Sequence, residues 1–122
     1  MELEIITLLS SELGGIDGFI SQKPEGISLP AFVVECRQGR GESLYGNQGK
    51  PLGYDYELQV NILDSRYVAI RNKRELVIEL LDGFTGLIGD LDVIDCRLSD
   101  TTLGMNLDKS YECVLFFTIK TK

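Results

Sequence analysis

Residues 54–63 carry the pattern that most constrains the fold. Every second residue is apolar or aromatic, and the residues between them are polar. This alternation predicts a β-strand with one buried and one wet face, because successive side chains point to opposite faces. One wet face is typical of an antiparallel sheet, since parallel sheets are covered on both faces. The apolar set is Tyr54, Tyr56, Leu58, Val60 and Ile62, and the polar set is Asp55, Glu57, Gln59 and Asn61.

A helix is predicted directly after this strand, because the apolar period changes from two to helical at Asp64 and Ser65. Either residue can cap the helix by accepting hydrogen bonds from its free N–H groups. Glycines from Gly83 onward end it. The apolar stripe of this helix consists of Ile70, Val77, Leu80, Leu81 and Phe84.

The rest of the chain predicts one more helix and three more strands. Residues 2–13 have a helical apolar face and precede the helix-ending pair Gly14-Gly15. The last strand is apolar on both faces, which indicates a central position in the sheet. The strands are expected at residues 31–38, 91–98 and 110–120, and the loops and turns at residues 15–30, 39–53 and 99–106.

These elements give the order α-β-β-α-β-β. We therefore predict one α+β domain over residues 1–122, with a four-stranded, mostly antiparallel sheet and two helices packed on one face. A chain of 122 residues can bury a core without the help of disulfides or metal.

The composition argues against several classes of function. A formal net charge of −7 opposes wrapping around nucleic acid, although it lets DNA pass nearby without sticking. The chain has no histidine, the commonest general base and metal ligand. It has no apolar run of membrane-spanning length and no signal-peptide pattern, so we expect a soluble protein made in a cytoplasm. Cys36, Cys96 and Cys113 match no zinc spacing and are expected to be small buried hydrophobes.

Two candidate ligand sites fail in detail. The glycine-rich segment 39–53 resembles a phosphate-binding loop, but Lys50 is followed by Pro51 and no glycine occupies Leu44. Asp90, Asp92 and Asp95 lack the glycine and terminal glutamate of a calcium loop, and Asp95 faces away from the other two on a strand. We therefore expect no cofactor, no metal and no enzymatic activity.

Basic residues crowd the start of the second helix, where they oppose the helix dipole. The cluster consists of Arg66, Arg71, Lys73 and Arg74. Two explanations stay open. The cluster either pairs locally with Asp64, Glu75 and Glu79, or contacts an acidic partner or a neighbouring subunit.

A loop ending in Leu29-Pro30 feeds a strand, a glycine-rich excursion follows, and the strand at residues 56–64 runs directly into the helix that contains residues 76–81. With the first helix and the two closing strands, this order resembles the tail-completion (tail terminator) proteins of long-tailed bacteriophages. The resemblance covers nearly the whole chain, and it consists of a pattern of elements rather than a catalytic signature. The basic cluster departs from it, because family members often carry small apolar or acidic residues there.

The resemblance implies a structural virion protein, assembled in the host cytoplasm and located in the tail. Such proteins form a ring, usually of six copies, at the head-proximal end of the tail tube. The ring ends tube polymerisation and presents a surface to the connector proteins of the head. The partners implied are further copies of this chain, the tail tube protein and a head connector protein, while DNA passes through without specific binding.

A closed ring needs two different, complementary patches on one subunit. We predict one patch in the segment 39–53, with Arg40, Tyr45 and Lys50 as contacts, and the other at the helix start. The second set consists of Arg71, Lys73 and Arg74.

Three alternatives remain open from the sequence. The first is another head–tail joining protein, such as a stopper. The second is a small cytoplasmic α+β ligand-binding or regulatory dimer, which would have a defined apolar pocket. The third, an enzyme that uses carboxylates or Cys36, is disfavoured because no residue has an activating partner in the sequence.

Deleting residues 41–49 is expected to leave a folded monomer that no longer assembles, because the predicted contacts of this segment serve the ring and not the core. Size exclusion with light scattering measures the mass, and circular dichroism checks the fold. A truncated protein that still forms rings would contradict this interface.

Overall fold

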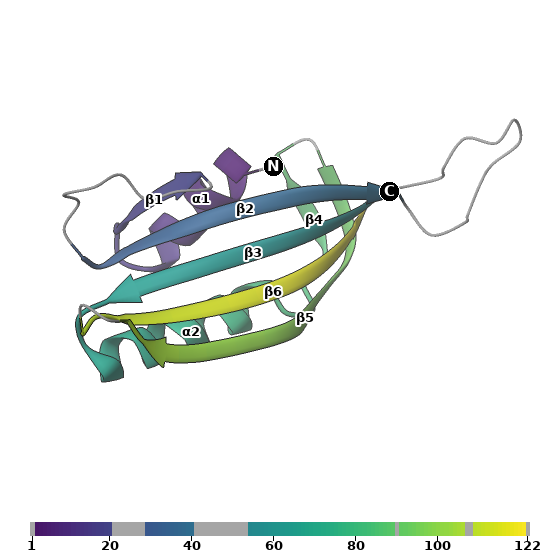
Figure 1. Cartoon of the computed structure of the whole chain (residues 1–122). Coiled ribbons are helices and arrows are strands. Elements are labelled where there is room, and N and C mark those ends of the chain that lie inside the picture. The colour runs from purple at the N-terminus through teal and green to yellow at the C-terminus, as the bar shows by residue number, and fades with distance from the viewer. Residues whose placement is uncertain (1, 21–28, 41–53, 90, 107–108, 122) are drawn as a thin grey trace, which may run out of the picture.

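The computed structural model describes residues 2–20, 29–40, 54–89, 91–106 and 109–121. The described part of the chain forms one sheet with two helices packed against it (Figure 1). In chain order the elements are α1 (Glu2–Glu12), β1 (Asp17–Ile20), β2 (Ala31–Arg40), β3 (Tyr54–Asp64), α2 (Tyr67–Leu81), β4 (Gly86–Ile88), β5 (Leu91–Met105) and β6 (Tyr111–Thr121).

The sheet is mixed, with the strand order β1-β2-β3-β6-β5-β4. The short β1 runs parallel to β2, and every other neighbouring pair is antiparallel. β6 lies between β3 and β5, which confirms the central position predicted from its two apolar faces.

The alternation along β3 decides which face of the sheet is buried. Leu58, Val60 and Ile62 are almost completely buried, whereas Glu57 on the other face is exposed. The register places Leu58 beside Phe117 of β6, which is also buried. The long strands therefore share one apolar face, here called the inner face.

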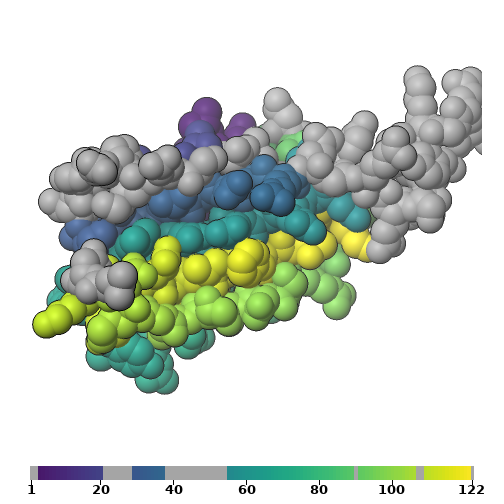
Figure 2. All heavy atoms as spheres, viewed as in Figure 1, coloured from purple at the N-terminus to yellow at the C-terminus, as the bar shows by residue number. Residues whose placement is uncertain are grey.

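Both helices cover the inner face and share its core. α1 contributes two buried residues and α2 three, all at helical spacing, and these pack into one cluster with the inner-face side chains. The opposite face, here called the outer face, has no helix in front of it, and Figure 2 shows β2, β3, β6 and β5 lying side by side there. The helical core residues are Ile5 and Leu9 of α1 and Ile70, Val77 and Leu81 of α2, and the buried Leu13 follows directly after α1.

The prediction of a four-stranded, mostly antiparallel sheet is wrong. The structure has six strands, because β1 and β4 form within segments predicted as loop and helix end. Four and three residues long, they are too short to show a readable alternation. β5 also continues through residues 99–105, which were predicted as a turn, because these residues pair with β6 as far as Met105.

Two irregularities in β5 accompany the strong curvature of the sheet, which curls into a half-barrel (Figure 1). The register with β6 shifts between Val93 and Asp95 and again between Leu98 and Asp100. Such β-bulges bend a strand and increase its twist. The two sheet edges consequently both approach α1, since an added Cβ would lie 2.9 Å from Ile6 at Gly18 of β1 and 2.7 Å from Glu4 at Gly89 after β4.

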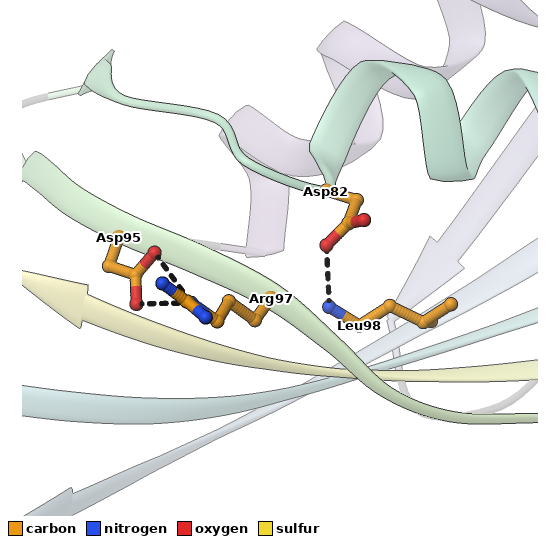
Figure 3. A network of polar contacts seen from close by, with 4 residues as sticks. All are labelled: Asp82, Asp95, Arg97 and Leu98. Atoms are coloured by element: carbon orange, nitrogen blue, oxygen red, sulfur yellow. Dashed lines mark hydrogen bonds and ion pairs between the residues drawn. The ribbon is translucent and has the colours of Figure 1, made fainter.

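The carboxyl end of α2 is tied to β5 where β4 no longer covers the strand edge (Figure 3). The Asp82 carboxylate accepts a hydrogen bond of 3.0 Å from the backbone N–H of Leu98. The N–H of Gly83 donates to the carbonyl of Cys96 at 2.7 Å. These bonds satisfy strand-edge groups that would otherwise lack partners, and they fix the position of α2 across the sheet.

Replacing Gly18 with alanine is expected to lower the free energy of unfolding by about 1–3 kcal/mol through overpacking. The new Cβ would overlap the ring of the fully buried Phe32 and lie 2.9 Å from the Cγ2 atom of Ile6. Urea denaturation measures the change. Gly104→Ala is the matched control, because a Cβ at this strand glycine meets nothing within 4 Å. Equal stabilities of the two variants would contradict the packing described.

Candidate interaction surface

The outer face of the sheet contains a hollow of about 390 Å³. Its central row runs across four strands, because the register aligns Glu35 of β2, Gln59 of β3, Phe116 of β6 and Asp100 of β5. The Phe116 side chain is 37% exposed. The lining residues, here called the sheet hollow, are Glu35, Arg37, Glu57, Leu58, Gln59, Ser99, Asp100, Phe116, Phe117 and Thr118.

The sheet hollow is acidic. Three carboxylates line it, against the single guanidinium of Arg37. Among the residues that the structure describes, Glu35 and Glu57 make no ion pair, although Arg37 lies opposite Glu57 in the register. Hydrogen bonds hold Gln59 in place beside the hollow, since its side chain donates to Asn61 (2.9 Å) and Asn61 donates to the carboxylate of Glu112 on β6 (3.1 Å). The hollow therefore presents an exposed aromatic ring among carboxylates that make no ion pair with another described residue.

At the other side of the sheet, Asp64 holds the start of α2. Its carboxylate accepts hydrogen bonds from the backbone N–H of Arg66 (3.1 Å) and from the Lys73 ammonium (2.8 Å). Burial opposes ionisation of this carboxyl group, but these bonds and the charge of Lys73 outweigh burial, so the pKa of Asp64 lies below its ordinary value of 3.8. The prediction that Asp64 or Ser65 caps this helix is wrong, because the N-cap residue is Arg66 and no side chain makes a cap hydrogen bond. Asp64 instead accepts from the backbone N–H of Arg66, just before the helix.

An exposed basic and apolar patch lies beside this anchor. Tyr67 and Val68 begin α2 and are 48% and 67% exposed. The ring of Tyr67 contacts that of Tyr111 edge-on, with centroids 5.6 Å apart. Arg66 and Arg71 are exposed, and neither makes an ion pair with another described residue. We call Arg66, Tyr67, Val68 and Arg71 the α2 patch.

The structure separates the three basic residues predicted as one patch. Arg71 is exposed, whereas Lys73 is engaged by Asp64. The Nη2 atom of Arg74 lies 3.7 Å from the Oε1 atom of Glu75, and the Arg74 side chain is 23% exposed. Its buried Nε atom has no hydrogen-bond partner among the described atoms. Ion pairing with nearby carboxylates therefore explains why Lys73 stands at the helix start and explains Arg74 only weakly. It does not explain Arg71.

The other predicted patch cannot be placed. Tyr45 and Lys50 lie outside the described residues. Arg40 ends β2, and its side chain is also not described. These contacts stay predictions. Sequence reasoning missed the sheet hollow, although it identified Glu57 and Gln59 as a wet face. It also missed Tyr67 and Val68. Their exposure could have been predicted, because both fall outside the apolar stripe of their helix.

The described residues offer little for catalysis. They contain no group of three or more potential metal-ligating side chains that could hold an ion, and Asp90 of the rejected calcium site lies outside them. Burial and the nearby carboxylates of Asp82 and Asp95 raise the pKa of the Cys96 thiol to about 12. Burial also raises the pKa of Cys113. Both thiols stay protonated near neutral pH and are poor nucleophiles.

No described helix has the length and apolar character needed to cross a membrane.

Comparisons with known proteins identify the fold but no family. No protein-family model matches the chain, and no curated protein matches it. A solved structure does. The fold is similar to that of a chain in the virion of a native gene transfer agent (GTA) particle, with a TM-score of 0.69. The match covers 98% of this chain and 88% of that chain, at 10% sequence identity. At this identity the likeness establishes a shared fold.

Replacing Asp64 with asparagine is expected to lower the free energy of unfolding near neutral pH by about 1.5–3 kcal/mol, because two hydrogen bonds to a charged group are weakened. The pKa of Asp64 is lowered on folding, so its contribution is complete above 3.8 and is lost as pH falls through the folded-state pKa. The difference from wild type should therefore be constant at neutral pH and shrink in acid. Urea denaturation at a series of pH values measures it.

The control for this substitution is Asp92→Asn, which removes an exposed carboxylate of β5 that has no ion pair within the described chain. It is expected to change stability by less than about 0.5 kcal/mol. A destabilisation of Asp64→Asn that does not depend on pH would show that the ionised carboxylate does not hold α2.

Proposed function

We propose that this protein is a structural component of a phage-like virion, located in the tail, and that it caps the head-proximal end of the tail tube as a ring. The observation that carries the proposal is the fold shared with a chain of the GTA virion, a phage-like particle, over nearly the full length of both chains. The neighbour supports a structural rather than an enzymatic role. The finer assignment to a tail terminator rests on the resemblance in element order described above.

The surfaces of the molecule suit assembly. The sheet hollow and the α2 patch lie on different sides of the sheet, because α2 packs on the inner face through Ile70, Val77 and Leu81 and turns its exposed residues away from the sheet. Two different surfaces on one subunit favour head-to-tail contacts, which close into a ring when each step includes a suitable rotation. The net charge of −7 would repel DNA from the wall of such a ring and let it slide through.

The ring is expected to have a mass about six times the 13.6 kDa of one chain. Light scattering after size exclusion, across a range of concentrations, measures the mass. Negative-stain images of the heaviest fraction should show a central hole. Because assembly can depend on a template, a second sample contains phage tail tubes, and labelled protein is expected at one end of each tube.

Other results would direct the assignment elsewhere. Rings that do not bind tail tubes but bind the head connector would favour a stopper. A compact dimer of constant mass, with no binding to tubes, would favour the ligand-binding or regulatory alternative. Monomers that fail to bind tube ends in the second sample would refute the terminator assignment.

A further inference from the structure

The charges at the start of α2 conflict with the local physics of a helix. The first turn contains no acidic residue, and Arg66 at the N-cap and Arg71 in the second turn add positive charge at the positive end of the helix dipole. Asp64 offsets part of this charge, but it is engaged by Lys73 and by backbone N–H groups. Two guanidinium groups therefore remain without an ion pair among the described residues, beside the exposed Tyr67 and Val68.

The sheet hollow has the complementary properties. It combines an exposed aromatic ring, Phe116, with the carboxylates of Glu35, Glu57 and Asp100. The α2 patch combines two exposed apolar side chains with two arginines. Arginine suits such a contact, since its planar guanidinium pairs with carboxylates and stacks on aromatic rings. The apolar parts can pack together while opposite charges meet around them, which is the usual arrangement of an interface core and rim.

We propose that the α2 patch of one copy of this chain docks in the sheet hollow of the next copy, and that this contact links the subunits of the ring. In this proposal the sheet hollow takes the place of residues 39–53 as the surface that receives the helix start. The inference rests on the proposed function and names the interface that the function requires. A copy of the same chain is the favoured occupant because both halves of the contact are present on one molecule with matching charge. The two halves lie on different sides of the sheet, so each copy can use both at once.

The test uses two variants of the full chain with opposite defects. The patch variant carries Arg66→Glu and Arg71→Glu, and the hollow variant carries Glu35→Arg. Each is expected to raise the concentration at which half of the protein is assembled by at least tenfold, because like charges would face each other. Thr118→Arg, which adds a positive charge to the hollow from β6, serves as a second hollow variant if Glu35→Arg does not fold.

Mixing the two variants gives the sharpest result. The patch variant retains a wild-type hollow and the hollow variant retains a wild-type patch, so the mixture contains one intact contact. The two altered surfaces also meet with opposite charges, because the glutamates of the patch variant face the arginine of the hollow variant. We expect the mixture to assemble, whereas either variant alone stays monomeric under the same conditions. Sedimentation velocity, with one variant fluorescently labelled, measures the masses.

Stability separates the proposed contact from a purely structural role for the arginines. If the arginines only supported the fold, replacing them would lower the unfolding temperature. Glutamate near the start of a helix is favourable to the dipole, so the patch variant should unfold at the same temperature as wild type or higher while its assembly is lost. Glu79→Arg is the control, because it reverses a charge on α2 about two turns beyond Arg71. It is expected to assemble as wild type does.

Several outcomes would overturn the inference. Variants that assemble as wild type does would show that the ring uses other surfaces, and the proposed function would stand. Monomers in every sample, including the mixture, would rule out this contact. Binding of wild type to tube ends would still test the proposed function separately. A third outcome is that wild type binds a DNA duplex of random sequence, the patch variant does not, and their masses are equal. The α2 patch would then be a phosphate-binding surface.

Discussion

The rest of the structure depends on burial of the inner face of the sheet. β3 and β6 alternate so that one face is continuously apolar, and a single sheet cannot hide that face from water on its own. Two helices of 11 and 15 residues cover it, and they contribute two and three buried side chains. The bulges in β5 help to curl the sheet around α1, and both described helices lie on the inner face, so neither of them covers the outer face.

The long elements could be predicted from the sequence, and the short ones could not. β3 and β6 have clear patterns because their own side chains decide which face is buried. β1 contains Gly18, a residue that disfavours strands. The glycine is needed because Phe32 and Ile6 leave no room for a side chain there, and the strand forms because β2 offers a parallel partner. The extension of β5 contains the turn-favouring residues Ser99, Asp100 and Gly104, and pairing with β6 overrides that preference.

The candidate surfaces show a similar limit. Helical periodicity identified the basic cluster but could not sort its members, because the carboxylate that engages Lys73 lies nine residues away, at the end of β3. Only the tertiary arrangement separates Lys73, which holds the helix in place, from Arg71, which is free to contact a partner. The sheet hollow is formed by β2, β3, β6 and β5, which come from distant parts of the chain and become neighbours only when the strands pair. No local pattern could indicate it.

Natural sequences usually agree with the local preferences of their structure, and departures concentrate where function requires them. Arginines at the positive end of α2 are such a departure, since acidic residues there would stabilise the helix. The anchoring of α2 makes the departure informative. Asp64 holds one end of the helix and Asp82 the other, so the exposed arginines are presented on a fixed support. A rigid positive patch that makes no ion pair within the described residues, in a chain of net charge −7, fits the proposed contact with the acidic outer face of the same sheet.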